Sequence, residues 1–314
     1  MLSYNQMKDK PTVLLSFTSL RQSEFEELAQ KLAQVFQTLE NEAQDNAERQ
    51  RAVGGGRDVT TLETVEDRLL FILFYLKTYP LQEVLAFLFC MSQSQANYWI
   101  HWLAHLLKQT LGELGYLPER LGERLEEVLS EHETLAFVQD GCERQRQRPK
   151  DPAQQKAYYS GKKKTHTIKN HVVVHPESRR VCYLSPTVRG KKHDKKLADE
   201  SHLKFPHLAT LEQDTGFQGF EVESVILLQP QKKPRGGELA VSDKFINRCI
   251  SSGRIVVENV IASIKRCRIV KDVIRNWKVN FDDLAMLLAC GLHNLRVAHR
   301  SPTETINLVD FYFR

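Results

Sequence analysis

The sequence predicts an α/β fold in which a mixed sheet flanked by helices follows an all-α N-terminal region. Up to about residue 107, apolar residues recur at the spacing of amphipathic helices. From residue 135 onward, short apolar runs of strand length alternate with helical patterns. The expected order there is three strands, a helix, two strands and then helices, which is typical of a mixed sheet covered by helices.

The composition is that of a folded protein with two or three domains, since 41% of its 314 residues are hydrophobic and 26% are charged. No apolar run approaches the roughly 20 residues of a membrane helix, and the N-terminus lacks a signal-peptide pattern. The six cysteines are scattered, which excludes a zinc knuckle and a secreted disulfide scaffold. We therefore expect a soluble, unexported protein in a reducing compartment, with no membrane partner.

The N-terminal region, residues 1–56, is expected to be a helical arm. Residues 19–50 carry apolar side chains at helical spacing, and Gly54, Gly55 and Gly56 then break the pattern. The next segment, residues 57–110, contains three apolar helical runs at 67–77, 81–89 and 92–107. The breaks between them are short enough for a helix-turn-helix.

In the last of these three helices, amide side chains face the position expected for DNA. Ser92 would cap the helix, and Gln93, Gln95 and Asn97 are suited to base edges. An ordinary helical bundle with these amides in water is the alternative, because acidic residues outnumber basic ones between residues 57 and 108.

A charged helical connector, residues 111–134, leads into the sheet-forming region, residues 135–300, which is followed by a tail, 301–314. Strands are expected at 135–140, 166–175, 180–188, 208–212 and 225–228. Helices are expected at 194–202, 245–250, 254–268 and 284–297.

The positive charge of the chain is concentrated between residues 143 and 164, where eight basic residues face two acidic ones. The net charge is +5, so the remainder of the chain sums to about −1. This segment begins three residues after Asp140 and would attract a polyanion such as DNA, although a solvated loop is the alternative. Its candidate DNA contacts are Arg144, Arg148, Lys162, Lys163 and Lys164.

Three carboxylates are candidates for binding divalent cations: Asp140 and Asp214 after short strands, and Glu258 on a helix. Two such cations, about 3.5–4 Å apart and held by oxygen ligands, can catalyse phosphodiester chemistry. Each acid has a simpler alternative: a turn for Asp140-Gly141 and for Asp214, and surface ion pairing for Glu258. On an ideal helix Glu258 shares a face with Arg254 and Lys265, within about 40°.

Together these motifs resemble the DDE transposases of the insertion-sequence-five and PIF/Harbinger superfamily, over about residues 57–300. The matching segments, in family order, are Val138-Gln139-Asp140-Gly141 with Arg144, Arg148 and Pro149; Tyr158-Tyr159-Ser160-Gly161-Lys162-Lys163-Lys164 with His166-Thr167; Asp214-Thr215-Gly216-Phe217; and Arg254-Ile255-Val256-Val257-Glu258 through Lys265. The helices between residues 68 and 103 resemble the upstream helix-turn-helix of this family. Cys142 departs from the family, where threonine is common.

The resemblance implies an RNase H-like catalytic fold in which Asp140, Asp214 and Glu258 bind two Mg²⁺ ions, with Mn²⁺ as a substitute. It also implies that Arg254 and Lys265 contact DNA phosphates near the scissile bond. His193 and Asp194 lie in a further recurrent segment of the family and are candidates for an auxiliary polar contact, with helix capping as the alternative for Asp194.

The function that the resemblance implies is that of a transposase. Such a protein binds the terminal inverted repeats of its element, cleaves the DNA, and joins the 3′ hydroxyl to target DNA, as a homodimer or larger assembly. The expected location is the cytoplasm, on the nucleoid of a bacterium, or the nucleus of a eukaryote. A non-catalytic DNA-binding regulator derived from a transposase and an RNase H-like nuclease in repair are the alternatives.

Overall fold

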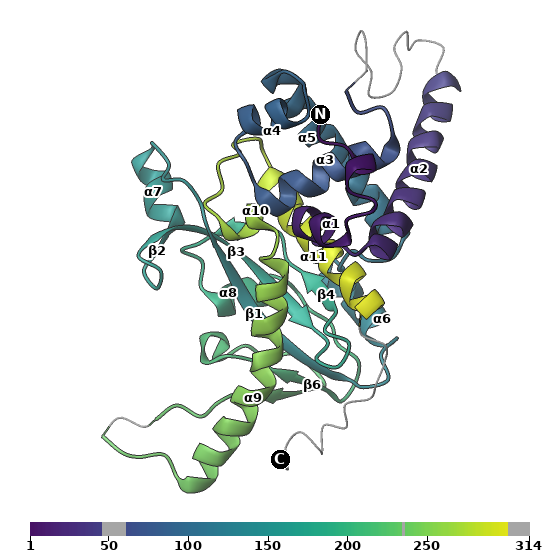
Figure 1. Cartoon of the computed structure of the whole chain (residues 1–314). Helices are drawn as coiled ribbons and strands as arrows, with labels where there is room; N and C mark the ends of the chain where they lie inside the picture. The colour runs from purple at the N-terminus through teal and green to yellow at the C-terminus, as the bar shows by residue number, and fades with distance from the viewer. Residues whose placement is uncertain (46–60, 234–235, 301–314) are drawn as a thin grey trace. The chain divides into compact units, whose positions relative to one another are not determined.

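The computed structural model describes residues 1–45, 61–233 and 236–300, which form two compact units (Figure 1). One unit comprises Met1–Leu117, Lys265–Asp272 and Lys278–Arg296. The other comprises Pro118–Ile264, Val273–Trp277 and the chain after Arg296. The division differs from the five segments expected from the sequence, because helices near the C-terminal end pack with the first 117 residues. The predicted glycine break at 54–56 and the tail lie outside the described residues.

The first unit is helical throughout its described part. Its helices are η1 (Tyr4–Gln6), α1 (Pro11–Thr18), α2 (Gln22–Asp45), α3 (Val65–Thr78), α4 (Gln82–Leu88), α5 (Gln93–Glu113), α10 (Arg268–Lys271) and α11 (Phe281–Arg300). Helix α2 is the helix expected for the N-terminal arm. The structure adds α1, which begins with a proline at its first position, where the missing N–H costs no hydrogen bond.

Helices α3, α4 and α5 form the expected helix-turn-helix. Ser92 caps α5 in a reciprocal capping box: its hydroxyl accepts from Gln95 N (3.2 Å), and its own N–H donates to Gln95 Oε1 (2.9 Å). Trp99, Leu103 and Leu106 are buried, so the inward face of α5 is the predicted one. The expected helix over residues 111–133 is instead an irregular segment with two short helices, η2 (Gly122–Arg124) and α6 (Leu125–Leu129).

The second unit is built on a mixed, RNase H-like sheet. Its strands are β1 (Ala136–Gln145), β2 (Tyr159–Ser160), β3 (Thr165–Val174), β4 (Val181–Leu184), β5 (Val188–Arg189), β6 (Ala209–Glu212) and β7 (Val225–Leu228). The long strands lie in the order β4-β3-β1-β6-β7, and the short β2 and β5 also pair with β3. Neighbours up to β1 are antiparallel, whereas β1, β6 and β7 are parallel.

Strand β1 is longer than predicted and continues past Asp140. Its antiparallel ladder with β3 extends to Gln145, but its parallel ladder with β6 ends at the pair Val138 and Glu212. Asp140 therefore lies at a strand end only with respect to β6. Had the register continued by two residues, Asp140 would stand opposite Asp214.

Helices cover both faces of this sheet. Residues alternate between the faces along a strand, so Phe137 and Leu211 point to one face and Asp140 and Glu212 to the other. The first face holds the buried core with α8 (Asp194–Asp199), where Phe137, Leu211 and Ala198 pack together. Against the second face lies α9 (Val241–Ile264), which packs on β1 and β6 (Figure 1).

Helix α9 is one continuous helix, whereas the sequence predicted two helices over 245–250 and 254–268. The expected break coincides with Ser251-Ser252-Gly253, which the structure keeps helical. The helix ends at Ile264, so Lys265 follows it and lies in the other compact unit. The single face predicted for Arg254, Glu258 and Lys265 therefore holds in the helix for Arg254 and Glu258 alone. The structure also contains α7 (Pro152–Tyr158), inside the predicted basic loop.

Candidate active site

Asp140 and Asp214 extend from neighbouring parallel strands toward the α9 face of the sheet. Burial raises the pKa of Asp140, and the N–H of Gly141, which donates to Asp140 Oδ1 at 2.7 Å, lowers it. The charges of Arg254, Asp214 and Asp194 also act on this pKa, Arg254 lowering it and the two aspartates raising it. The carboxylates are therefore close enough to repel each other, a situation that a shared cation would relieve.

A one-turn 3-10 helix, η3 (Thr215–Phe217), fixes Asp214. Asp214 is the N-cap of this helix, and its Oδ1 accepts from the backbone N of Thr215 at 2.6 Å. Phe217, at the end of the turn, is buried in the core on the opposite face of the sheet. The sequence Asp214-Thr215-Gly216-Phe217 thus does form a turn, as its simpler interpretation held. The same turn presents the carboxylate beside Asp140.

Arg254 is the positive group that faces these acids. Its Nη1 lies 3.5 Å from Asp214 Oδ1, and its side chain is only 18% exposed. The same guanidinium lowers the pKa of Asp140 and of Glu212. The sequence predicted a contact with DNA phosphate, but in this structure Arg254 points at carboxylates.

Glu258 lies one helical turn after Arg254, so it projects from the same side of α9. Val257, Val260 and Ile264 are buried beside it and orient the helix, whereas Glu258 itself is exposed. Among residues 1–45, 61–233 and 236–300, no three His, Cys, Asp or Glu side chains are placed to hold a metal ion together. The structure thus pairs Asp140 with Asp214 and places Glu258 on the helix that faces them, without closing a three-carboxylate cluster.

Glu212 is a further acid on this face that the sequence did not single out. It precedes Asp214 by two residues, and burial raises its pKa to about 7, an effect that the charge of Arg254 reduces. Its carboxylate lies where a Cβ on Gly253 would be, so the two groups are in contact across the strand and the helix. The two-residue period of a strand could have indicated Glu212, since residues 212 and 214 point to the same side of the sheet.

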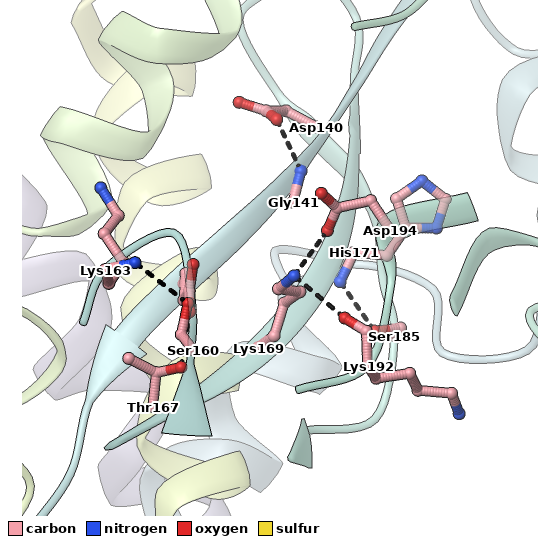
Figure 2. A network of polar contacts seen from close by, with 11 residues as sticks. Asp140, Gly141, Ser160, Lys163, Thr167, Lys169, His171, Ser185, Lys192 and Asp194 are labelled. Carbon is pink, nitrogen blue, oxygen red and sulfur yellow. Dashed lines mark hydrogen bonds and ion pairs between the residues drawn. The ribbon is translucent and has the colours of Figure 1, made fainter. Parts of the chain in front are cut away.

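Asp194 and Lys169 form an ion pair near Asp140, on the opposite face of the sheet (Figure 2). Lys169 Nζ lies 2.9 Å from Asp194 Oδ1 and donates to the carbonyl of Lys192 at 3.1 Å. A Cβ on Gly141 would lie 2.7 Å from Asp194 Oδ1, and one on Gly216 would lie 3.2 Å from Oδ2. The Asp194 carboxylate therefore lies between Gly141 of β1 and Gly216 of the turn that follows Asp214.

This position does not support the helix-capping interpretation of Asp194, whereas its auxiliary contact remains a prediction. The N-cap of α8 is His193, which makes no side-chain capping bond, and Asp194 pairs with Lys169 instead of capping the helix. His193 is exposed. Asp194 thus packs against Gly141 of β1 and Gly216 of η3, behind the two aspartates.

The residues predicted to contact DNA differ in their accessibility. Arg144 is 2% exposed and donates to Asn170 Oδ1 at 2.8 Å and to Thr187 Oγ1 at 3.1 Å, so its predicted DNA contact is not supported. It points inward because Arg144 and Asn170 lie near each other on the antiparallel strands β1 and β3. Arg148 is exposed and donates to Gln155 Oε1. Residues 162–164 are exposed lysines in the turn between β2 and β3.

The three amide side chains at the start of α5 form hydrogen bonds to other residues of the helix-turn-helix. Gln93 Nε2 and Asn97 Nδ2 donate to Gln82 Oε1 of α4, and Gln95 completes the capping box. Gln93 and Gln95 are exposed and Asn97 is half-buried, so all three remain at the surface. Their predicted contact with bases remains a prediction.

Two family models match this architecture. The model described as DDE superfamily endonuclease matches residues 139–294, which include Asp140, Asp214 and Glu258. The model described as the helix-turn-helix of DDE superfamily endonuclease matches residues 60–113, which include α3, α4 and α5. The chain belongs to the DDE superfamily of endonucleases. The resemblance found in the sequence is thereby confirmed, with the helix-turn-helix upstream of the RNase H-like sheet.

A curated relative of this DDE family member is a "Probable transposase for insertion sequence element IS702" from Microchaete diplosiphon. It is 34% identical over 161 residues, which are 51% of this chain and 57% of the relative. The match thus spans little more than half the length of that protein. No solved structure matches the chain. In the described part of the chain, no helix combines the length and apolarity needed to cross a bilayer.

Proposed function

We propose that the chain is a transposase that cleaves DNA at the ends of its element and transfers the strands to target DNA. One observation carries this proposal: Asp140 and Asp214 lie together on one face of the RNase H-like sheet, facing the helix of Glu258. The match to the DDE superfamily endonucleases and the name of the relative support it.

The residues of this face fit a hard divalent cation in their chemistry. Carboxylate oxygens are the ligands that Mg²⁺ and Mn²⁺ prefer. Arg254 lies against Asp214 and lowers the pKa of Asp140, so a positive charge of the chain already stabilises both acids. We propose that Asp140, Asp214 and Glu258 hold two Mg²⁺ ions, for which Mn²⁺ can substitute. When bound, the ions supply an activated attacking oxygen and a stabilised leaving oxygen for phosphoryl transfer.

The chain's own groups then hold the acids and the DNA in place. The turn at Thr215 and the N–H of Gly141 each fix one aspartate oxygen. A cation held by Asp214 would compete with Arg254 for the carboxylate, and the planar guanidinium of Arg254 would then hold a phosphate oxygen of the DNA. The contact with phosphate predicted from the sequence thus belongs to the loaded site, and Lys265 is its proposed companion.

Binding of double-stranded DNA is assigned to two surfaces. The helix-turn-helix would bind the terminal inverted repeats, with Gln93, Gln95 and Asn97 near base edges. The turn with Lys162, Lys163 and Lys164, together with Arg148, would bind the phosphate backbone beside the catalytic strand. Because two element ends must be joined, we propose a homodimer or larger assembly on DNA.

The test is Mg²⁺-dependent cleavage of DNA that carries the candidate element ends. We expect Asp140→Asn, Asp214→Asn and Glu258→Gln each to lower the cleavage rate by at least about 10²- to 10³-fold, the typical cost of losing one charge-stabilising group. Glu238→Gln, on an exposed residue outside the site, is the matched control and should cleave at the wild-type rate.

Each outcome assigns a function. If one variant cleaves at the wild-type rate, its residue is not a ligand. Binding of the ends without cleavage by the wild type would favour a DNA-binding regulator derived from a transposase. Cleavage of structured or RNA-containing substrates, without preference for element ends, would favour a repair nuclease.

A further inference from the structure

A chain of buried hydrogen bonds connects the two catalytic strands one residue before each aspartate. Gln139 Nε2 donates to Gln213 Oε1 at 2.5 Å, and His171 Nε2 lies 2.8 Å from Gln139 Oε1. Gln139 and His171 have no exposed surface and Gln213 is 1% exposed. These side chains lie on the α8 face of the sheet, opposite the carboxylates.

The chain of hydrogen bonds occurs where the backbone no longer connects the strands. The parallel ladder of β1 and β6 ends at the pair Val138 and Glu212. Beyond it, the N–H of Gln213 donates to the carbonyl of Leu228 in the direction of β7, at 3.0 Å. The amide pair of Gln139 and Gln213 therefore extends the connection between β1 and β6 by one residue. It ends directly before Asp140 and Asp214.

The histidine of this chain of hydrogen bonds is neutral and carries one N–H. Complete burial lowers the pKa of His171 to about 3, so the ring is uncharged at neutral pH. With its Nε2 as donor, Gln139 Oε1 is the acceptor, which leaves Gln139 Nε2 to donate to Gln213. The backbone of His171 is itself fixed, because its N–H donates to Ser185 Oγ at 2.8 Å (Figure 2).

We propose that Gln139 and Gln213 are positioning residues that hold Asp140 and Asp214 at the separation a divalent cation requires. Each glutamine precedes its aspartate directly, so a shift of either side chain moves the adjacent carboxylate. Partners that orient metal ligands from behind typically change metal affinity by about 10- to 100-fold when they are removed. The inference rests on the proposed function, since it assigns a role toward that same site.

A role in packing alone would have a different consequence. Replacing both buried partners with apolar side chains of similar volume is often neutral for stability, whereas leaving one amide unpaired is costly. Because His171 Nε2 also loses its partner when Gln139 is replaced, stability and metal affinity separate in a triple variant that adds His171→Phe. If the pair serves packing alone, the triple variant regains both stability and Mn²⁺ affinity, and if it positions the acids, it regains stability without affinity.

The experiment measures Mn²⁺ binding to the full chain without DNA, by the electron paramagnetic resonance signal of free Mn²⁺. The variants are Gln139→Met, Gln213→Met and the triple variant that combines both with His171→Phe, and the melting temperature of each metal-free protein is recorded. We expect each to bind Mn²⁺ about tenfold or more weakly. Gln147→Met, on an exposed glutamine just after β1, is the matched control and should bind as wild type does.

Folded variants whose Mn²⁺ affinity stays within about twofold of the wild type overturn the inference. Should the single variants fail to fold, the triple variant, which leaves none of the three polar side chains unpaired, decides. Asp140→Asn separates the two proposals. If it abolishes Mn²⁺ binding while the glutamine variants bind normally, the positioning role alone is wrong. If it leaves Mn²⁺ binding unchanged, or the wild type binds no Mn²⁺, the proposed site is wrong as well.

Discussion

Arg254 and Lys169 each lie against a carboxylate of the candidate site, on opposite faces of the sheet. Arg254 faces Asp214 in a partly open position, where the binding of a stronger cation can displace it. Lys169 is more enclosed: its side chain is 10% exposed, and its ammonium group is held by Asp194 and by the carbonyl of Lys192. The pair of Arg254 and Asp214 can therefore open when a cation binds, whereas the pair of Lys169 and Asp194 stabilises the structure behind the site.

The Lys169 and Asp194 pair should matter for stability. We expect Lys169→Met to lower the free energy of unfolding by about 2–4 kcal/mol, because it leaves the Asp194 carboxylate without its cation behind the sheet. Urea unfolding measures this loss, and adding Asp194→Asn should recover part of it. Lys195→Met is the control: its pair with Asp199 has a similar separation, 2.7 Å, but is well exposed, so the loss should stay below about 1 kcal/mol. Equal losses for the two lysines would contradict the prediction.

His132 should make the protein sensitive to acid. It stacks on His175 at 4.1 Å, and burial, with the charges of His175 and Arg180, lowers its pKa to about 4. The neutral ring favours the folded state above the ordinary pKa of 6.5, and this stability is lost as the pH falls toward 4. Because the ring is partly exposed, we expect the wild type to lose about 1–2 kcal/mol from this residue over that range.

His132→Phe keeps the stacked ring and removes the titration. The comparison is therefore between two pH profiles of the free energy of unfolding, measured from pH 7 to pH 4. The variant should show a shallower decline than the wild type. Parallel profiles would show that His132 is protonated equally in the folded and unfolded chains.

At the scale of elements, α9 carries Arg254 and Glu258 and contacts the sheet through Gly253. Glycine within a helix usually costs stability, by about 1 kcal/mol relative to alanine. Here it admits the carboxylate of Glu212, which lies where a larger residue would place its Cβ. The distance between helix and strand at the site thus depends on a residue without a side chain.

This contact predicts a sign reversal. Gly253→Ala should destabilise the wild type, because it displaces the half-buried Glu212 carboxylate. In a Glu212→Ala background the same change should stabilise by up to about 1 kcal/mol, the helix preference of alanine over glycine. Thermal or urea unfolding of the four proteins in this double-mutant cycle checks it. Equal effects of Gly253→Ala in both backgrounds would show that the two residues are independent.

The strands could be predicted from the sequence, whereas the continuity of helix α9 through Gly253 could not. The strands were predictable because apolar runs of strand length have few alternatives, and three of the five expected strands lie within about one residue of their observed ends, whereas β1 continues from its expected end at residue 140 to Gln145. The third was expected at 180–188, where the structure places β4 and the separate β5. The continuous helix was missed because serine and glycine favour a break locally, while packing of α9 on β1 and β6 keeps it intact.

The site was predictable only in part, for a similar reason. The acids follow from local patterns and family order, whereas the roles of Glu212, Gln139 and Gln213 depend on the register between β1 and β6. That register is a contact between residues more than 70 positions apart. The burial of Arg144 was equally hidden, since a basic segment gives no sign of which side chain its strand turns inward.

At the scale of the whole molecule, charge is distributed unevenly. The three lysines of the turn between β2 and β3 are exposed and adjoin the catalytic strand through β3. Such a cluster attracts DNA irrespective of its base sequence, because it replaces counterions along the phosphates. In the proposed function, recognition of a particular sequence belongs to the helix-turn-helix.

The lysine turn should therefore change the salt dependence of DNA binding. We expect the triple substitution of Lys162, Lys163 and Lys164 by alanine to weaken binding to all DNA sequences alike and to reduce the slope of log affinity against log salt by up to about 3. Fluorescence anisotropy at several salt concentrations measures this. Lys196→Ala, on an exposed lysine of α8, should leave the slope nearly unchanged. A loss confined to one DNA sequence would show that the turn reads bases instead.

The helical unit consists of three separate segments of the chain, and this affects the order in which the protein folds during synthesis. That unit requires Lys278–Arg296 to complete its core, where the ring of Phe281 packs edge-on against His101 at 4.7 Å. At about 5–20 residues per second, a ribosome needs roughly ten to forty seconds to translate from Leu117 to that helix. All strands of the sheet leave the ribosome within this interval. The nascent chain can thus finish its catalytic sheet before its DNA-binding helices reach their final packing.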